Sequence, residues 1–118
     1  MSDSSITIYH NPRCSKSRQT LELIRASGAE PTVVEYLKTP PSNSELDGIL
    51  KKLNLEPLDL MRSQEAIFRE LDLSSKDLSR DDAMAVMIEN PVLIERPIVV
   101  KGSKAVIGRP PGNVQELL

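Results

Sequence analysis

The first part of the chain places its single cysteine where a strand turns into a helix. Residues 6–9 are β-branched or aromatic, and the turn signal Asn11-Pro12 ends this run. After Cys14 the chain has neither glycine nor proline until Gly28, which predicts a helix between these two positions. Cys14 is therefore expected at or next to the N-cap of this helix.

The start of this helix should favour a negatively charged sulfur. Its first backbone N–H groups are unpaired and carry a partial positive charge, which stabilises a thiolate or a bound oxyanion. His10 lies nearby, no Asp or Glu occurs in residues 6–20, and three basic residues crowd the turn: Arg13, Lys16 and Arg18. We therefore predict a lowered pKa for the Cys14 thiol, and a shift of about two units requires only about 2.7 kcal/mol.

An inert buried residue is the alternative interpretation of Cys14. A lone cysteine in a cytosolic protein is more often an inert buried residue than a nucleophile. Structural cysteines do not usually lie among Arg, Lys and Ser after an Asn-Pro turn, so the surroundings of Cys14 favour a reactive thiol.

The length and composition of the chain limit the classes of protein to which it can belong. We expect a single domain over residues 1–118, and one cysteine excludes an internal disulfide. The N-terminal residues have neither a basic start nor an apolar run, so no signal peptide is expected and the cytoplasm is the expected compartment. No apolar run approaches the ~20 residues of a membrane span. A net charge of −2 with scattered basic residues predicts no nucleic-acid binding.

A second strand is predicted at residues 32–37, after Pro31. Strand, helix and strand together form a βαβ unit, in which the two strands run parallel. The loop at the carboxyl end of the first strand is then available for ligands, and Cys14 lies in that loop.

The middle of the chain is predicted to be a helical insertion over about residues 42–90. Polar start signals and apolar stripes indicate its helices. The first helix begins at the capping box Ser42 and Glu45, and a short helical turn at 57–62 and a brief helix around 66–71 follow it. The last helix begins at Ser79 with Asp82 and ends at Asn90-Pro91.

The last part of the chain predicts a hairpin and a short helix. Strands are expected at 98–101 and 105–107 around the turn 102–104, followed by a helix at 113–118. The predicted fold is α/β, a thioredoxin-like three-layer sandwich with a four-stranded mixed sheet and a helical insertion between strands 2 and 3.

Three separated runs of the sequence resemble the glutaredoxin-coupled arsenate reductases: YHNPRCSKSR at 9–18, NPVLIERPIV at 90–99 and IGRP at 107–110. The resemblance covers essentially the full length, and three motifs in the same order are far more specific than one cysteine at a helix start. It implies a single-cysteine enzyme that reduces arsenate to arsenite with glutathione as co-substrate and glutaredoxin as partner. No bound cofactor and no metal are expected.

The same resemblance implies a role for each site residue. The matching positions are Cys14 as the nucleophile that attacks arsenic, His10 as a group that helps to keep the thiol ionised, and Arg62, Arg96 and Arg109 as the arginines that hold the oxyanion. We assign supporting roles to Arg13, Ser15, Ser17 and Pro97, the last of which resembles the cis-proline of thioredoxin folds.

Arginine suits the binding of a tetrahedral oxyanion. It is always charged, and its planar fork of donors forms strong bidentate hydrogen bonds. Any single arginine is more often a solvated surface charge, but Arg96 and Arg109 both precede prolines at predicted strand ends. Arg62 rests on the resemblance, and His10 has packing or capping as an equal alternative role.

A two-electron reduction requires two thiols, and this chain supplies one. Ser17 stands where a dithiol protein would carry its second cysteine, so the second thiol must come from outside. Two alternatives remain: a thiol enzyme of the same family that acts on another oxyanion or on a glutathione mixed disulfide, and a redox-responsive regulatory module of the Spx type. A monomer is compatible with the sequence, which does not fix the oligomeric state.

Overall fold

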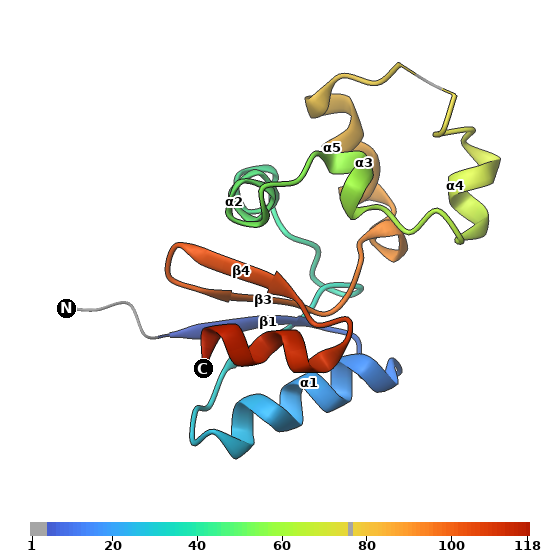
Figure 1. Ribbon diagram of the computed structural model, residues 1–118. Coiled ribbons are helices and arrows are strands. Elements are labelled where there is room, and N and C mark those ends of the chain that lie inside the picture. The colour runs from blue at the N-terminus through green and yellow to red at the C-terminus, as the bar shows by residue number, and fades with distance from the viewer. Residues whose placement is uncertain (1–4, 76) are drawn as a thin grey trace. The chain divides into compact units, whose positions relative to one another are not determined.

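The computed structural model describes residues 5–75 and 77–118 (Figure 1). They form two compact units. The first combines the chain up to Thr39 with Arg96–Leu118, and the second is Pro40–Glu95. The second unit corresponds to the predicted insertion at about 42–90, while the prediction of one domain over 1–118 stays a prediction.

The first unit contains a mixed four-stranded sheet. Its strands are β1 (Ile6–His10), β2 (Thr32–Glu35), β3 (Ile98–Lys101) and β4 (Lys104–Ile107), in the order β2-β1-β3-β4. β1 is parallel to β2 and antiparallel to β3, and β3 is antiparallel to β4. The predicted βαβ unit and the predicted hairpin are therefore confirmed.

One face of the sheet is covered by α1 (Ser15–Ala26) and by the C-terminal 3₁₀-helix η2 (Pro111–Leu117), drawn in red in Figure 1. The packing follows from the alternation of side chains along β1, which turns every second residue to this face. A buried apolar cluster results, formed by Ile6, Ile8, Ile24, Val99, Val114 and Leu117. This cluster fixes α1, and with it the loop that carries Cys14, against the sheet.

The largest differences from the predicted boundaries in this unit are at the end of β2 and at the start of the C-terminal helix. β2 ends at Glu35 and not at residue 37, because the backbone N–H groups of Lys38 and Thr39 both donate to the Glu35 carbonyl, at 3.0 and 2.9 Å, and close a turn. The C-terminal helix begins at Pro111 and not at residue 113, and it is 3₁₀. Proline is well suited to a first helical position, since its φ angle is already helical and it needs no acceptor there.

The second unit is helical. Its elements are α2 (Asn43–Leu53), α3 (Pro57–Leu60), α4 (Ala66–Glu70), α5 (Arg80–Glu89) and the 3₁₀-helix η1 (Pro91–Leu93). α5 packs against α2, α3 and η1. Of the helices within the described ranges, none has both the length and the apolar character that a membrane span requires.

The predicted helix starts in this unit are confirmed. The Ser42 hydroxyl accepts from the Glu45 backbone N–H at 3.2 Å, and the Glu45 carboxylate accepts from the Ser42 N–H at 2.8 Å, which is a complete capping box. The Ser79 hydroxyl accepts from the Asp82 N–H at 3.1 Å. Residues 61–62 were predicted to be helical, but Met61 forms an antiparallel β-bridge with Ile94 instead.

Candidate active site

Cys14 occupies the N-cap of α1, as predicted. Its backbone is extended, with φ −94° and ψ 121°. Its N–H donates to the Asn11 carbonyl at 3.0 Å, and its own carbonyl accepts from the Arg18 N–H at 3.0 Å, the first hydrogen bond of the helix. The half-buried side chain thus stands at the positive end of the helix.

The surroundings of Cys14 favour its thiolate. Burial alone would raise the pKa of the thiol, but the backbone N–H of Ser17 and the guanidinium of Arg96 lower it, with a smaller contribution from the Lys16 N–H. The pKa of Cys14 therefore lies below its ordinary value, which confirms the predicted direction. The guanidinium that contributes comes from Arg96, distant in sequence, while Arg18 donates to the Pro12 carbonyl at 2.9 Å.

His10 is buried at the end of β1 and joins the first turn of α1 through Ser17. Its Nδ1 and the Ser17 hydroxyl share a hydrogen bond of 2.6 Å, and the same hydroxyl accepts from the Asn11 N–H at 3.1 Å. Burial lowers the pKa of His10, which Glu35 partly offsets, so the imidazole is mainly neutral at neutral pH. His10 is thus linked to the first turn of α1 through Ser17, and its predicted role in keeping the thiol ionised stays a prediction.

The register of the sheet explains how Arg96 reaches Cys14. β3 pairs with β1 so that Ile98 lies opposite Tyr9. The residues just before β3 therefore lie beside the end of β1, where the loop to Cys14 begins. The Arg96-Pro97 bond is cis, in line with the resemblance of Pro97 to the cis-proline of thioredoxin folds, and the Nε and Nη1 atoms of Arg96 are buried.

The loop that carries Arg109 lies at the same edge of the sheet. β4 ends at Ile107, which pairs with Ile98, and the Gly108 N–H donates to the Pro97 carbonyl at 2.9 Å. The Asn113 side chain holds this loop by donating to the carbonyls of Ile107 and Arg109, at 3.1 and 3.2 Å. The Arg109-Pro110 bond is also cis, which the sequence did not predict.

Arg62 belongs to the second unit and makes ion pairs with carboxylates there. Its guanidinium pairs with Glu65, and its Nε lies 3.6 Å from a Glu95 carboxylate oxygen. Its backbone N–H donates to the Leu93 carbonyl at 2.7 Å. A role for Arg62 in oxyanion binding stays a prediction.

The remaining supporting residues lie on the loop and on the first turn of α1. Arg13 is exposed, and its backbone N–H donates to the Asn11 side-chain oxygen at 3.0 Å. Ser15 is the exposed first residue of α1. Within residues 5–75 and 77–118, no group of His, Cys, Asp or Glu is arranged to hold a metal ion.

Comparison with known proteins identifies the family. The sequence profile of the ArsC family matches residues 9–117, a range that contains all the predicted site residues. The chain belongs to the ArsC family. This assignment confirms the resemblance seen in the three sequence runs.

Relatives of this ArsC-family chain match it over nearly their whole length. An uncharacterized protein of Escherichia coli K12, YfgD, is 48% identical, covering 96% of this chain and 96% of YfgD. The arsenate reductase of Haemophilus influenzae is 44% identical, covering 97% of this chain and 99% of its own. The solved structure of an arsenate reductase from Vibrio cholerae superposes with a TM-score of 0.93 at 48% identity, covering 98% of each chain. These matches confirm the predicted fold class.

Two residues of the ArsC-family site region were not found by sequence reasoning. Gly108 has no predicted role of its own within the IGRP run, yet a Cβ atom there would lie 2.5 Å from the Thr20 hydroxyl and 2.8 Å from the Pro97 ring. Asn113 is predicted only as the first residue of a helix, although its side chain donates to the Arg109 carbonyl and holds that loop. Neither function has a local signal, because each depends on a partner brought near by the sheet.

Proposed function

We propose that this ArsC-family chain is an arsenate reductase with Cys14 as its nucleophile. The observation that carries the proposal is the guanidinium of Arg96 at the thiol of Cys14, which lowers the thiol pKa at the N-terminus of α1. The H. influenzae and V. cholerae relatives that bear the name arsenate reductase support the choice of substrate.

The first step forms a sulfur–arsenic bond without any change of oxidation state. The Cys14 thiolate attacks arsenic, one arsenate oxygen leaves as water after taking up protons, and a Cys14–S–As(V) adduct remains. Attack of one anion on another is repulsive unless positive charge offsets it. Arg96 and the N–H groups of α1 supply that charge, and Arg109 and Arg62 are the further arginines assigned to the oxyanion.

The second step transfers two electrons to arsenic. The thiolate of glutathione attacks the Cys14 sulfur, the sulfur–arsenic bond breaks with its electron pair on arsenic, and arsenite leaves as As(III). The product on the protein is a mixed disulfide of Cys14 and glutathione. Glutaredoxin then takes over the glutathione by thiol–disulfide exchange and returns Cys14 to the thiol. External thiols are required because Cys14 is the single cysteine of the chain.

A reducing compartment follows from this chemistry. The resting enzyme needs a free thiol, so we assign it to the cytoplasm, where glutathione keeps thiols reduced. The proposed site draws on one chain, so the proposed active form is a monomer that takes arsenate, glutathione and glutaredoxin in turn.

A coupled assay tests the proposal. The assay contains arsenate, glutathione and glutaredoxin, and glutathione reductase couples the oxidation of glutathione to that of NADPH. We expect oxidation of NADPH that depends on arsenate. The Cys14→Ser variant should abolish it, while Gln19→Ala, an exposed change further along the same helix, should retain it. Absence of turnover with the wild-type chain, or full turnover with Cys14→Ser, would refute the proposal. Turnover with glutathionylated substrates but not with arsenate would favour the alternative thiol enzyme.

A further inference from the structure

A cavity of about 240 Å³ opens beside the loop that leads to Cys14. One wall comes from the end of β1 and the following loop, and the other from the turn after β2. His10 and Glu35 lie side by side in the parallel pairing of β1 and β2, so both strands end at this cavity. Ligands in open α/β sheets bind at such an edge, outside the carboxyl ends of neighbouring strands.

The cavity shares a loop with the proposed nucleophile. Arg13 lines the cavity and directly precedes Cys14 in the chain. Asn11 also lines it, and this residue accepts from the Cys14 N–H through its carbonyl and from the Arg13 N–H through its side chain, both at 3.0 Å. The cavity therefore adjoins the loop whose hydrogen bonds hold Cys14 in place.

The charges around the cavity have mixed signs. Arg13 and Lys38 supply two exposed cations, and Glu35 supplies a carboxylate that is 43% exposed. Leu37, 42% exposed, adds an apolar surface. The Lys38 ammonium lies 3.4 Å from the Glu35 carboxylate, and an ion pair this exposed is weak, so a charged ligand can replace either partner.

We propose that this cavity is the binding site of the small thiol co-substrate, a peptide thiol of the glutathione class. Such a molecule carries two carboxylates and one ammonium, which match two cations and one carboxylate around the cavity. This inference rests on the proposed function, because that function is what requires an external thiol at Cys14.

The dimensions of the cavity agree with partial occupancy by such a ligand. Whole small-molecule ligands fill pockets of about 300–1,000 Å³, so a cavity of about 240 Å³ holds the charged arm and leaves the rest outside. In the proposed binding mode, the remainder of the ligand and its thiol extend over the loop of residues 11–13, which leads to Cys14.

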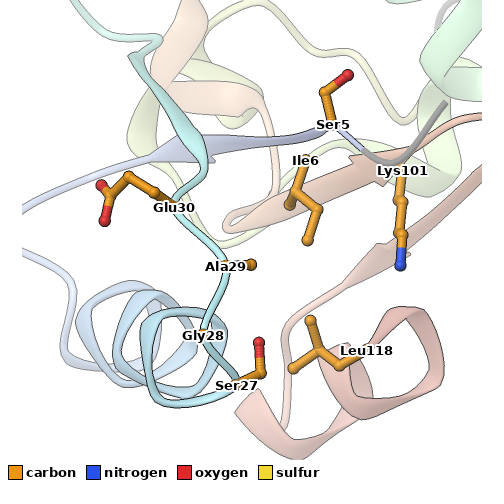
Figure 2. A pocket seen from close by; sticks show the side chains of 8 residues that line it. All are labelled: Ser5, Ile6, Ser27, Gly28, Ala29, Glu30, Lys101 and Leu118. Carbon is orange, nitrogen blue, oxygen red and sulfur yellow. The ribbon is translucent and has the colours of Figure 1, made fainter.

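A larger cavity of about 440 Å³ is a poorer candidate for this role (Figure 2). It lies at the other end of β1, between Ile6, the segment Ser27–Glu30 after α1 and the terminal Leu118. Five residues of strand separate that end from the loop to Cys14, which amounts to about 16 Å. The ammonium of Lys101 in this cavity already donates to the Leu117 carbonyl at 2.9 Å.

Steady-state kinetics with charge reversals test the site. Lys38→Glu and Glu35→Lys should each raise the KM for glutathione about fivefold or more, and the KM for arsenate should change less than twofold. Lys104→Glu makes the same charge change as Lys38→Glu, but on the β3–β4 hairpin, and should leave the KM for glutathione and the KM for arsenate as in the wild type. An unchanged KM for glutathione in both cavity variants would overturn the inference, as would a change confined to the KM for glutaredoxin.

A binding measurement separates this inference from the proposed function. S-Methylglutathione cannot react, and its titration into the ¹⁵N-labelled protein should shift the backbone N–H signals of Asn11, Arg13 and Lys38. Shifts that saturate at these residues support the site even if the chain does not reduce arsenate. Shifts gathered around Lys101 and Leu118, or no saturable shift while arsenate is reduced with glutathione, would contradict it.

Discussion

The Nδ1 atom of His10 and the hydroxyl of Ser17 lie 2.6 Å apart and fasten the first turn of α1 to the end of β1. The hydroxyl also accepts from the backbone N–H of Asn11, in the intervening loop, at 3.1 Å. Ser17 is fully buried and so is its bond to His10, which water therefore cannot readily replace. The backbone N–H of the same residue lowers the pKa of Cys14, so one buried serine connects strand, loop and thiol.

Ser17→Ala should therefore destabilise the protein and raise the thiol pKa. The substitution removes the partner of the buried His10 ring and of the part-buried Asn11 N–H, which costs about 1–3 kcal/mol. It also loosens the turn that holds the residue 17 N–H at the thiol, which should raise the thiol pKa. Chemical denaturation measures the loss, and the pH dependence of iodoacetamide labelling measures the thiol. Ser15→Ala is the matched control on the exposed side of the turn, and its free energy of unfolding should change by less than about 0.5 kcal/mol. Equal losses in the two variants would show that the buried hydroxyl has no special role.

Gly108→Ala should destabilise the packing of the Arg109 loop on α1. A Cβ atom at this position would lie 2.5 Å from the Thr20 hydroxyl and 2.8 Å from the Pro97 ring, both buried side chains that cannot easily move. Overpacking of this kind costs about 1–3 kcal/mol. Gly112→Ala, where a Cβ would meet nothing within 4 Å, serves as the control in thermal denaturation. The expectation fails if Gly108→Ala melts no lower than Gly112→Ala.

Stability should fall with pH below about 6.5 because of His10. Burial lowers the pKa of this side chain in the folded state, so the unfolded chain binds more protons between the folded and unfolded pKa values. The contribution of the neutral imidazole is complete above the unfolded pKa and is lost as the pH falls toward the folded pKa. His10 is the single histidine of the chain, so denaturation curves between pH 5 and 7 report on it. In His10→Gln the slope over this range should be much smaller, and an identical slope would contradict the assignment.

Local signals in the sequence were sufficient for most of the secondary structure. The N-cap position of Cys14, the capping box at Ser42 and the N-cap hydroxyl of Ser79 depend on residues within a few positions of one another, and the structure confirms these predicted helix starts. The end of β2 was predicted wrongly because Tyr36 and Leu37 have the composition of a strand, while backbone hydrogen bonds to Glu35 close a turn.

The candidate site depended on contacts that composition does not reveal. From the sequence, the positive charge near Cys14 was expected to come from its chain neighbours Arg13, Lys16 and Arg18. In the structure the Ser17 N–H at the helix start lowers the thiol pKa most, and the charged side chain that contributes is Arg96, which the antiparallel pairing of Tyr9 with Ile98 brings to the end of β1. That role of Arg96 followed from the family resemblance, because strand register cannot be deduced from the residues near Cys14 alone.

The most direct measurement is the pH dependence of Cys14 alkylation in the wild type, in Arg96→Gln and in Lys16→Gln. The structure predicts a wild-type thiol pKa below its ordinary value and a higher pKa in Arg96→Gln. The change in Lys16→Gln should be smaller, because Lys16 acts on the thiol through its backbone N–H and its side chain is exposed. Arsenate should protect the wild-type thiol from iodoacetamide and protect Arg96→Gln less. A wild-type pKa at the ordinary value, with no protection by arsenate, would contradict the account of Cys14 as an activated nucleophile.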